Sequence, residues 1–193
     1  MLIVFLSLIV LGSVACLWNR GIWGAGQSLV NTVFAALLAM NLFEPLADEL
    51  GSPKSNMMDF VCLWGLFAAF FAVFRLATDI VSRVKVRFPF GIDTVGAVVL
   101  AIATGWILFC FTMVSFHVSP LARSPFLGSF METPDQKMLG VGPDRLWLAF
   151  TRQASLGVFS AGGDGFDPQC DFVFKYAARR QVADDAHRAK IKK

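Results

Sequence analysis

The chain has 193 residues, of which 56% are hydrophobic and 16% are charged, and its formal net charge is +3 at pH 7. A typical soluble domain carries about 25% charged residues, so the composition indicates a membrane protein, and the small net charge indicates no nucleic-acid partner. Twelve charged side chains precede Val118 and nineteen follow it. We therefore predict a membrane domain at 1–117 and a polar extramembrane segment at 118–193.

The first predicted span covers about 1–18, where serines are the only polar interruptions. At about 1.5 Å per residue it is close to the lower limit for a bilayer core about 30 Å thick. A cleaved signal peptide, or a lipoprotein signal ending at Cys16, is the alternative. No Lys or Arg precedes the apolar run, so we expect a first helix that is retained.

The second predicted span is 22–43, which follows a tight turn at Asn19-Arg20-Gly21 and carries no charge. Gln27 and Asn31 are four residues apart, so they share one helix face. Polar side chains in lipid need partners, and we expect this face to point into the bundle and to form interhelical hydrogen bonds. A substrate path along the same face is the alternative.

An acidic connection is predicted between the second and third spans, at Glu44–Asp59. Pro45 and Gly51 indicate a turn there. An acidic loop is tolerated on the outer side of the membrane, and we place it there.

The third predicted span covers about 58–79, because its uncharged core of 15 residues is too short to cross alone. Arg75, Asp79 and Arg83 repeat every four residues, so we expect a ladder of ion pairs on one face. Such pairing would lower the cost of holding Arg75 and Asp79 near the hydrocarbon boundary. We interpret the pair as an interfacial anchor.

A basic loop follows, with Arg83, Lys85 and Arg87 in addition to Arg75. Basic residues in short loops favour the cytoplasmic side. This places the loop in the cytoplasm, and with four spans both termini lie on the other side.

The fourth predicted span is 94–117, with Asp93 as the expected N-cap of its helix. Ala97, Ala101 and Gly105 repeat every four residues. Small residues at this spacing allow another helix to approach closely, so we predict a helix–helix contact here. His117 is expected to be a solvated interfacial residue.

The polar segment holds one predicted amphipathic helix, Asp144–Phe159, which begins next to Pro143. Residues 172–176 could be a short strand or the start of a helix, and the charged tail from Arg179 is expected to be frayed. The four cysteines show no CxxC or Cys/His spacing, so neither a disulfide framework nor a metal site is indicated.

Three short motifs resemble the colicin V production protein (CvpA) family: the Asn19-Arg20-Gly21 turn, the small-residue-rich helix start Gly21–Leu29, and the run Gly91–Gly96, with Asp93 followed by Gly96. Thr94 stands where a basic residue is usual in that family. The resemblance covers roughly residues 1–120. It implies a four-helix inner-membrane protein associated with colicin V production or export and with envelope physiology.

The sequence thus predicts an all-α membrane protein with four spans, no cofactor and no metal. Our first functional hypothesis is a non-enzymatic scaffold or accessory factor in the bacterial inner membrane. Its expected partners are the lipid bilayer, other membrane proteins or a second copy of the chain. The alternative is a small transporter or channel component that uses the Gln27/Asn31 face and the Arg75/Asp79 pair. A membrane enzyme has the least support, because no nucleophile–base pattern is visible.

Overall fold

The computed structural model describes residues 2–50, 56–82, 88–119, 142–157, 165–179 and 181, and within these residues every regular element is a helix. Three helical segments are long and apolar enough to cross a membrane: Val4–Glu49, Met57–Val81 and Gly91–Val118. The all-helical fold predicted from the sequence is confirmed, whereas the division into four separate spans stays a prediction.

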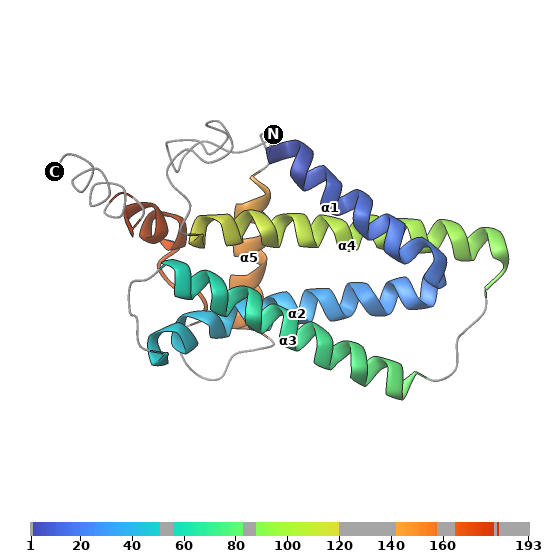
Figure 1. The fold of residues 1–193 in the computed structure, drawn as a ribbon, viewed down its shortest axis with the longest axis horizontal. Coiled ribbons are helices and arrows are strands. Elements are labelled where there is room, and N and C mark those ends of the chain that lie inside the picture. The colour runs from blue at the N-terminus through green and yellow to red at the C-terminus, as the bar shows by residue number, and fades with distance from the viewer. Residues whose placement is uncertain are drawn as a thin grey trace.

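The first of these segments is a hairpin, in which α1 (Leu2–Leu17) and α2 (Gly21–Glu49) are joined by the short 3-10 helix η1 (Trp18–Arg20). Figure 1 shows the chain reversing its direction at this connection. Gly21 has a φ of 71°, a conformation that side chains disfavour. A glycine at this position therefore allows the reversal to be this short.

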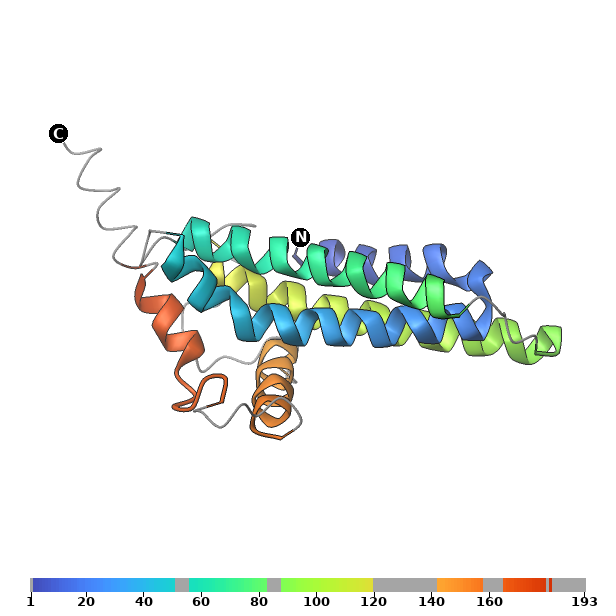
Figure 2. The same ribbon diagram turned by 90° about the horizontal axis from the view of Figure 1, so that it is seen from below.

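The turn predicted from Pro45 is wrong, because α2 continues through Pro45 to Glu49. A proline in a helix leaves the carbonyl four residues earlier without its usual donor, here that of Asn41. Figure 2 shows the last turns of α2 bending away from the direction of its first part. The longer helix buries Phe43 and Ala47 completely, and this burial favours continuing the helix despite the proline. Gly51 lies outside the described residues.

The remaining long helices are α3 (Asn56–Val81) and α4 (Phe90–Val118). α4 packs against α1 and α2, whereas α3 packs mainly on α2. The long helices lie roughly side by side in alternating directions (Figure 1). Phe43, Leu63 and Phe111, from three different helices, form the centre of the larger apolar core.

The fourth helix begins one turn earlier than predicted. Pro89 is the residue before the helix, and the N–H of Asp93 already donates to the carbonyl of Pro89 at 2.9 Å. Asp93 therefore lies in the first turn and is not the N-cap of α4. The physical reason is that its carboxylate binds another helix, as described below.

The polar segment contributes α5 (Pro143–Leu156) and a shorter helix at residues 172–179. α5 begins at the predicted proline but ends before Gly157, so the expected helix to Phe159 is too long at its C-terminal end. Residues 172–176 are helical, which decides between the two alternatives left by the sequence. Figure 1 shows α5 crossing the long helices at a steep angle, and Figure 2 shows that both elements lie on one side of the bundle.

Candidate functional site: a carboxylate–tyrosine cluster at one end of the bundle

Several sequence candidates meet where α1, α2 and α4 come together. Asp93 of α4 accepts a hydrogen bond from the backbone N–H of Ile22 at 2.9 Å, so it caps the N-terminus of α2. A carboxylate at this place also interacts favourably with the helix dipole. A Cβ added to Gly21 would lie 2.7 Å from the same carboxylate, and one added to Gly96 would collide with the Ile22 side chain. Arg20 is exposed beside this junction.

The small-residue stripe of α4 lies inside the helix packing. Ala97 and Ala101 are fully buried, as is Ala25 of α2, and Leu17 of α1 is 8% exposed in the same cluster. A Cβ added to Gly105 would collide with Ser13 and Val10 of α1. The stripe therefore lets α1 and α2 approach α4 closely.

The polar face of α2 is tied to α3 by one hydrogen bond. The Asn31 side-chain amide donates to the Thr78 hydroxyl at 3.0 Å, and Asn31 is 3% exposed. Gln27, one turn earlier, is half-buried. Nearer the N-terminus of α2, the Trp23 indole donates to the Ser82 hydroxyl at 2.8 Å, which links α2 to the residue after α3.

The predicted pair on α3 is present, with 3.1 Å between Arg75 Nε and Asp79 Oδ2. The Asp79 side chain is 52% exposed, which is compatible with a position near the end of the span. The third member of the predicted ladder, Arg83, lies outside the described residues, as do Lys85 and Arg87.

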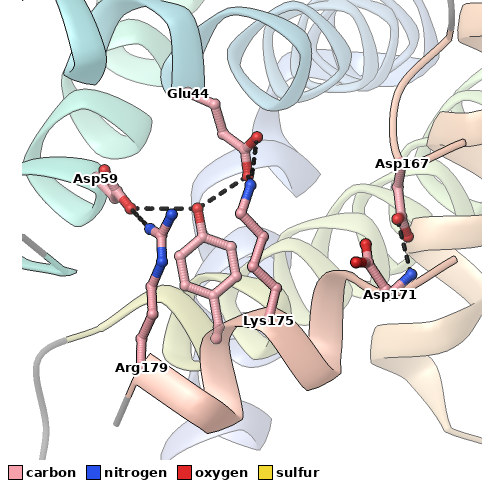
Figure 3. Close-up of polar contacts among 7 residues, drawn as sticks. Glu44, Asp59, Asp167, Asp171, Lys175 and Arg179 are labelled. Atoms are coloured by element: carbon pink, nitrogen blue, oxygen red, sulfur yellow. Dashed lines mark hydrogen bonds and ion pairs between the residues drawn. The ribbon is translucent and has the colours of Figure 1, made fainter. Parts of the chain in front are cut away.

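A larger polar site, which the sequence analysis missed, lies at the opposite end of α2 and α3. We call it the carboxylate–tyrosine cluster, and it consists of Glu44, Asp59, Lys175, Tyr176 and Arg179 (Figure 3). Lys175 donates to both carboxylate oxygens of Glu44 at 2.9 Å. Arg179 donates to Asp59 Oδ2 at 2.8 Å. The helix at 172–179 is thereby held against the ends of two long helices.

Tyr176 lies between the two carboxylates. Its hydroxyl oxygen is 3.0 Å from Glu44 Oε1 and 3.2 Å from Asp59 Oδ2. A phenol has one hydrogen and can donate it to only one carboxylate at a time. Burial and the nearby charges of Glu44 and Asp59 raise the pKa of the Tyr176 phenol well above its usual value. Tyr176 therefore stays protonated and serves as a neutral donor.

Apolar packing supports this polar cluster. The Tyr176 ring is fully buried and lies 4.8 Å from the Phe172 ring and 6.5 Å from the Phe43 ring, measured between centroids. The Arg179 guanidinium lies 5.1 Å from the Tyr176 ring centroid, within the range of a cation–π contact. The helix is therefore attached by both aromatic burial and ion pairs.

A second polar link joins α4 to α5. His117 Nε2 lies 3.1 Å from Asp144 Oδ2, and both side chains are mostly buried. The expectation of a solvated His117 is therefore wrong, because α5 covers it. Burial acts to raise the pKa of Asp144, but the hydrogen bond and charge of His117 outweigh burial and leave that pKa below its usual value.

These contacts can hold the polar segment against the membrane helices, but they do not form a nucleophile with an activating base. Among the residues that the structure describes, no group of three His, Cys, Asp or Glu side chains could hold a metal ion. One signal for the cluster was present in the sequence. Lys175, Tyr176 and Arg179 share a helix face, and the acids Glu44 and Asp59 stand at the ends of apolar runs.

The same chain was compared with protein-family models, with curated protein sequences and with solved structures, and none of these comparisons gave a match.

Proposed function

We propose that the protein is a non-enzymatic scaffold or accessory factor in the bacterial inner membrane, similar to the CvpA family and acting in toxin export or envelope assembly. One observation carries this proposal: the polar side chains of the helix interior are used as structural ties. Asn31 binds Thr78, Asp93 binds the start of α2, and Glu44 and Asp59 bind the polar segment. Because these side chains bind one another, they hold the helices in fixed positions, as a scaffold requires.

The proposal includes four spans. α1 has 16 residues, about 24 Å of helix, and it packs along α4. It is apolar apart from Ser7 and Ser13 and continues into α2 through a sharp reversal, which supports a separate short crossing. Hydrophobic mismatch of a few Å can be absorbed by local thinning of the bilayer.

The transporter alternative would require the Asn31 face or the Arg75/Asp79 pair to meet a solute path. The Asn31 amide already donates to Thr78, and Asp79 is bound to Arg75. Among the described residues, two cavities lie beside the polar segment, one at α5 and one at the end of α2. These observations favour the scaffold.

Two measurements test the proposal. A photocrosslinking amino acid at Ala178, exposed on the C-terminal helix, should crosslink to an envelope protein in living cells. The matched control at Val99, an exposed apolar position in the middle of α4, should crosslink mainly to lipid. The full chain in proteoliposomes should give no ion or solute flux above that of empty vesicles. Flux that disappears in an Asn31→Leu variant would support the transporter instead.

A further inference from the structure

A cavity of about 550 Å³ lies between α5 and the C-terminal segment. α5 lines it with Arg145, Leu148 and Arg152, and the C-terminal helix lines it with Val173 and Phe174. The volume falls in the range of small-molecule binding sites, which is about 300–1,000 Å³. Neither element belongs to a membrane span, and the carboxylate–tyrosine cluster holds this part of the chain in place.

The cavity carries a positive charge. Arg145 and Arg152 are seven residues apart, two helical turns, so both face the same side of α5. Asp167 is the acid that lines the cavity, and among the described residues no ion pair joins either arginine to a carboxylate. The walls therefore hold two cations against one anion.

The two arginines have different surroundings. Arg152 donates to Cys170 Sγ at 2.8 Å and to the Pro168 carbonyl at 3.1 Å, so it fixes the loop that forms one wall. Among the described residues, the side chain of Arg145 has no hydrogen-bond or ion-pair partner. Within this part of the chain, Arg145 is the guanidinium available to a ligand, and Arg152 adds charge from a fixed position.

The rest of the cavity wall is apolar. Leu156 and Phe174 line it and are also exposed, at 57% and 55%. α5 crosses the long helices steeply, so in a membrane with those helices upright it lies close to the bilayer plane (Figure 1). Helices in this orientation place apolar side chains at the boundary between headgroups and acyl chains.

We propose that this cavity binds the phosphoryl headgroup of an anionic membrane lipid. The Arg145 guanidinium presents paired N–H donors that match phosphate oxygens. The adjoining Leu156 and Phe174 side chains contact the start of the acyl chains. A soluble phosphate would use the same donors, but it would gain nothing from the apolar walls. The inference needs only the membrane location of the chain and does not depend on its scaffold role.

Native mass spectrometry of the purified full chain in neutral detergent tests the proposal. We expect phosphatidylglycerol to bind at least about tenfold more tightly than diacylglycerol, which has the same acyl chains but no phosphate. This ratio is typical of one charge-assisted hydrogen-bonded contact. Arg145→Gln should remove this preference. Arg20→Gln, which removes the same charge from an exposed site at the η1 connection, should keep it.

A second variant leaves both charges in place. Ala149 lines the cavity, and Ala149→Phe should fill it and weaken phosphatidylglycerol binding as Arg145→Gln does. If either Arg145→Gln or Ala149→Phe loses its helical circular dichroism, the binding measured with the variant that stays folded tests the proposal. Equal binding of the two lipids, or unchanged binding in the folded variants, would overturn the proposal. If inorganic phosphate displaces the lipid completely and binds with equal affinity, the ligand of the cavity is a soluble phosphate and not a lipid headgroup.

Discussion

At the scale of single residues, the environment of each ion pair determines what it contributes. Asp59 is 4% exposed and binds both Arg179 and Tyr176, whereas Asp79 at the opposite end of α3 is half-exposed and binds Arg75. Removing one partner of a buried pair leaves an uncompensated charge, but an exposed pair is screened by water. Asp59 should therefore contribute more to the folding stability than Asp79, although both lie on α3.

We predict that Asp59→Ala lowers the free energy of unfolding by about 3 kcal/mol, because Arg179 and Tyr176 lose their shared acceptor. The control, Asp79→Ala, should cost less than about 1 kcal/mol. Unfolding is followed by tryptophan fluorescence during titration with SDS. Adding Arg179→Met to Asp59→Ala should recover part of the loss. Equal costs for the two single variants would contradict the assigned difference in burial.

Gly21 is a second position where one residue matters. We predict that Gly21→Ala destabilises the protein by about 2 kcal/mol, since its φ of 71° is strained for a side chain and its Cβ would press on Asp93. The control is Gly65→Ala on α3, where a Cβ meets nothing within 4 Å and the higher helix propensity of alanine should stabilise by up to about 1 kcal/mol. In the same unfolding assay, the free energy of unfolding should fall for Gly21→Ala and rise for Gly65→Ala. A neutral Gly21→Ala variant would show that the reversal does not depend on this conformation.

At the scale of elements, α5 is joined to the bundle by one ionisable pair and by apolar packing of Trp147 and Leu148. The Asp144 pKa is lowered in the folded protein. A carboxyl group with a lowered folded pKa stabilises the fold above its unfolded pKa, and this contribution is lost as the pH falls through the folded value. The contribution of the Asp144 carboxylate to the docking of α5 should therefore be lost in acid.

We predict that Asp144→Asn lowers the melting temperature at pH 6, and that the difference from the unaltered chain shrinks below about pH 4. The window follows from the usual carboxyl pKa of 3.8 and the downward shift of Asp144. Comparing the two chains at each pH cancels the titration of the other acids. A melting-temperature difference that stays constant from pH 6 to pH 3 would show that ionisation of Asp144 plays no part in docking.

At the scale of the whole molecule, the two ends of the bundle carry different chemistry. One end holds Arg20 and the C-terminus of α3, which the basic run at 83–87 follows in the sequence. The other end holds Glu44, Asp59 and the helix at 172–179. Short-loop Lys and Arg determine orientation, while acids have little influence. We therefore propose that the polar segment and both termini lie outside the cytoplasm.

Cys170 tests this orientation, because it is exposed and belongs to the polar segment. A membrane-impermeant maleimide should label Cys170 in intact spheroplasts, and a Cys170→Ser variant should lose this label. Cys16 is also exposed in the structure but lies within the apolar α1, where bilayer lipid should protect it. Labelling that requires prior permeabilisation would reverse the orientation.

The sequence by itself determined the all-helical class, the presence of apolar helices long enough to cross a membrane and the close-packed stripe on α4. Apolar run length and four-residue spacing are local properties, so they can be counted along the chain. It failed at Pro45, where the burial of Phe43 and Ala47 favours continuing the helix, and at Asp93, where a local capping rule competed with a partner on another helix.

Only the tertiary structure decided which charges meet between different helices. Glu44 and Lys175 are 131 residues apart, and no spacing rule connects an acid at the end of one span with a tail that looks solvated. The partners are chosen by the fold as a whole. Burial of Phe172 and Tyr176 against Phe43 brings the C-terminal helix to the ends of α2 and α3, and there a buried acid must find a cation.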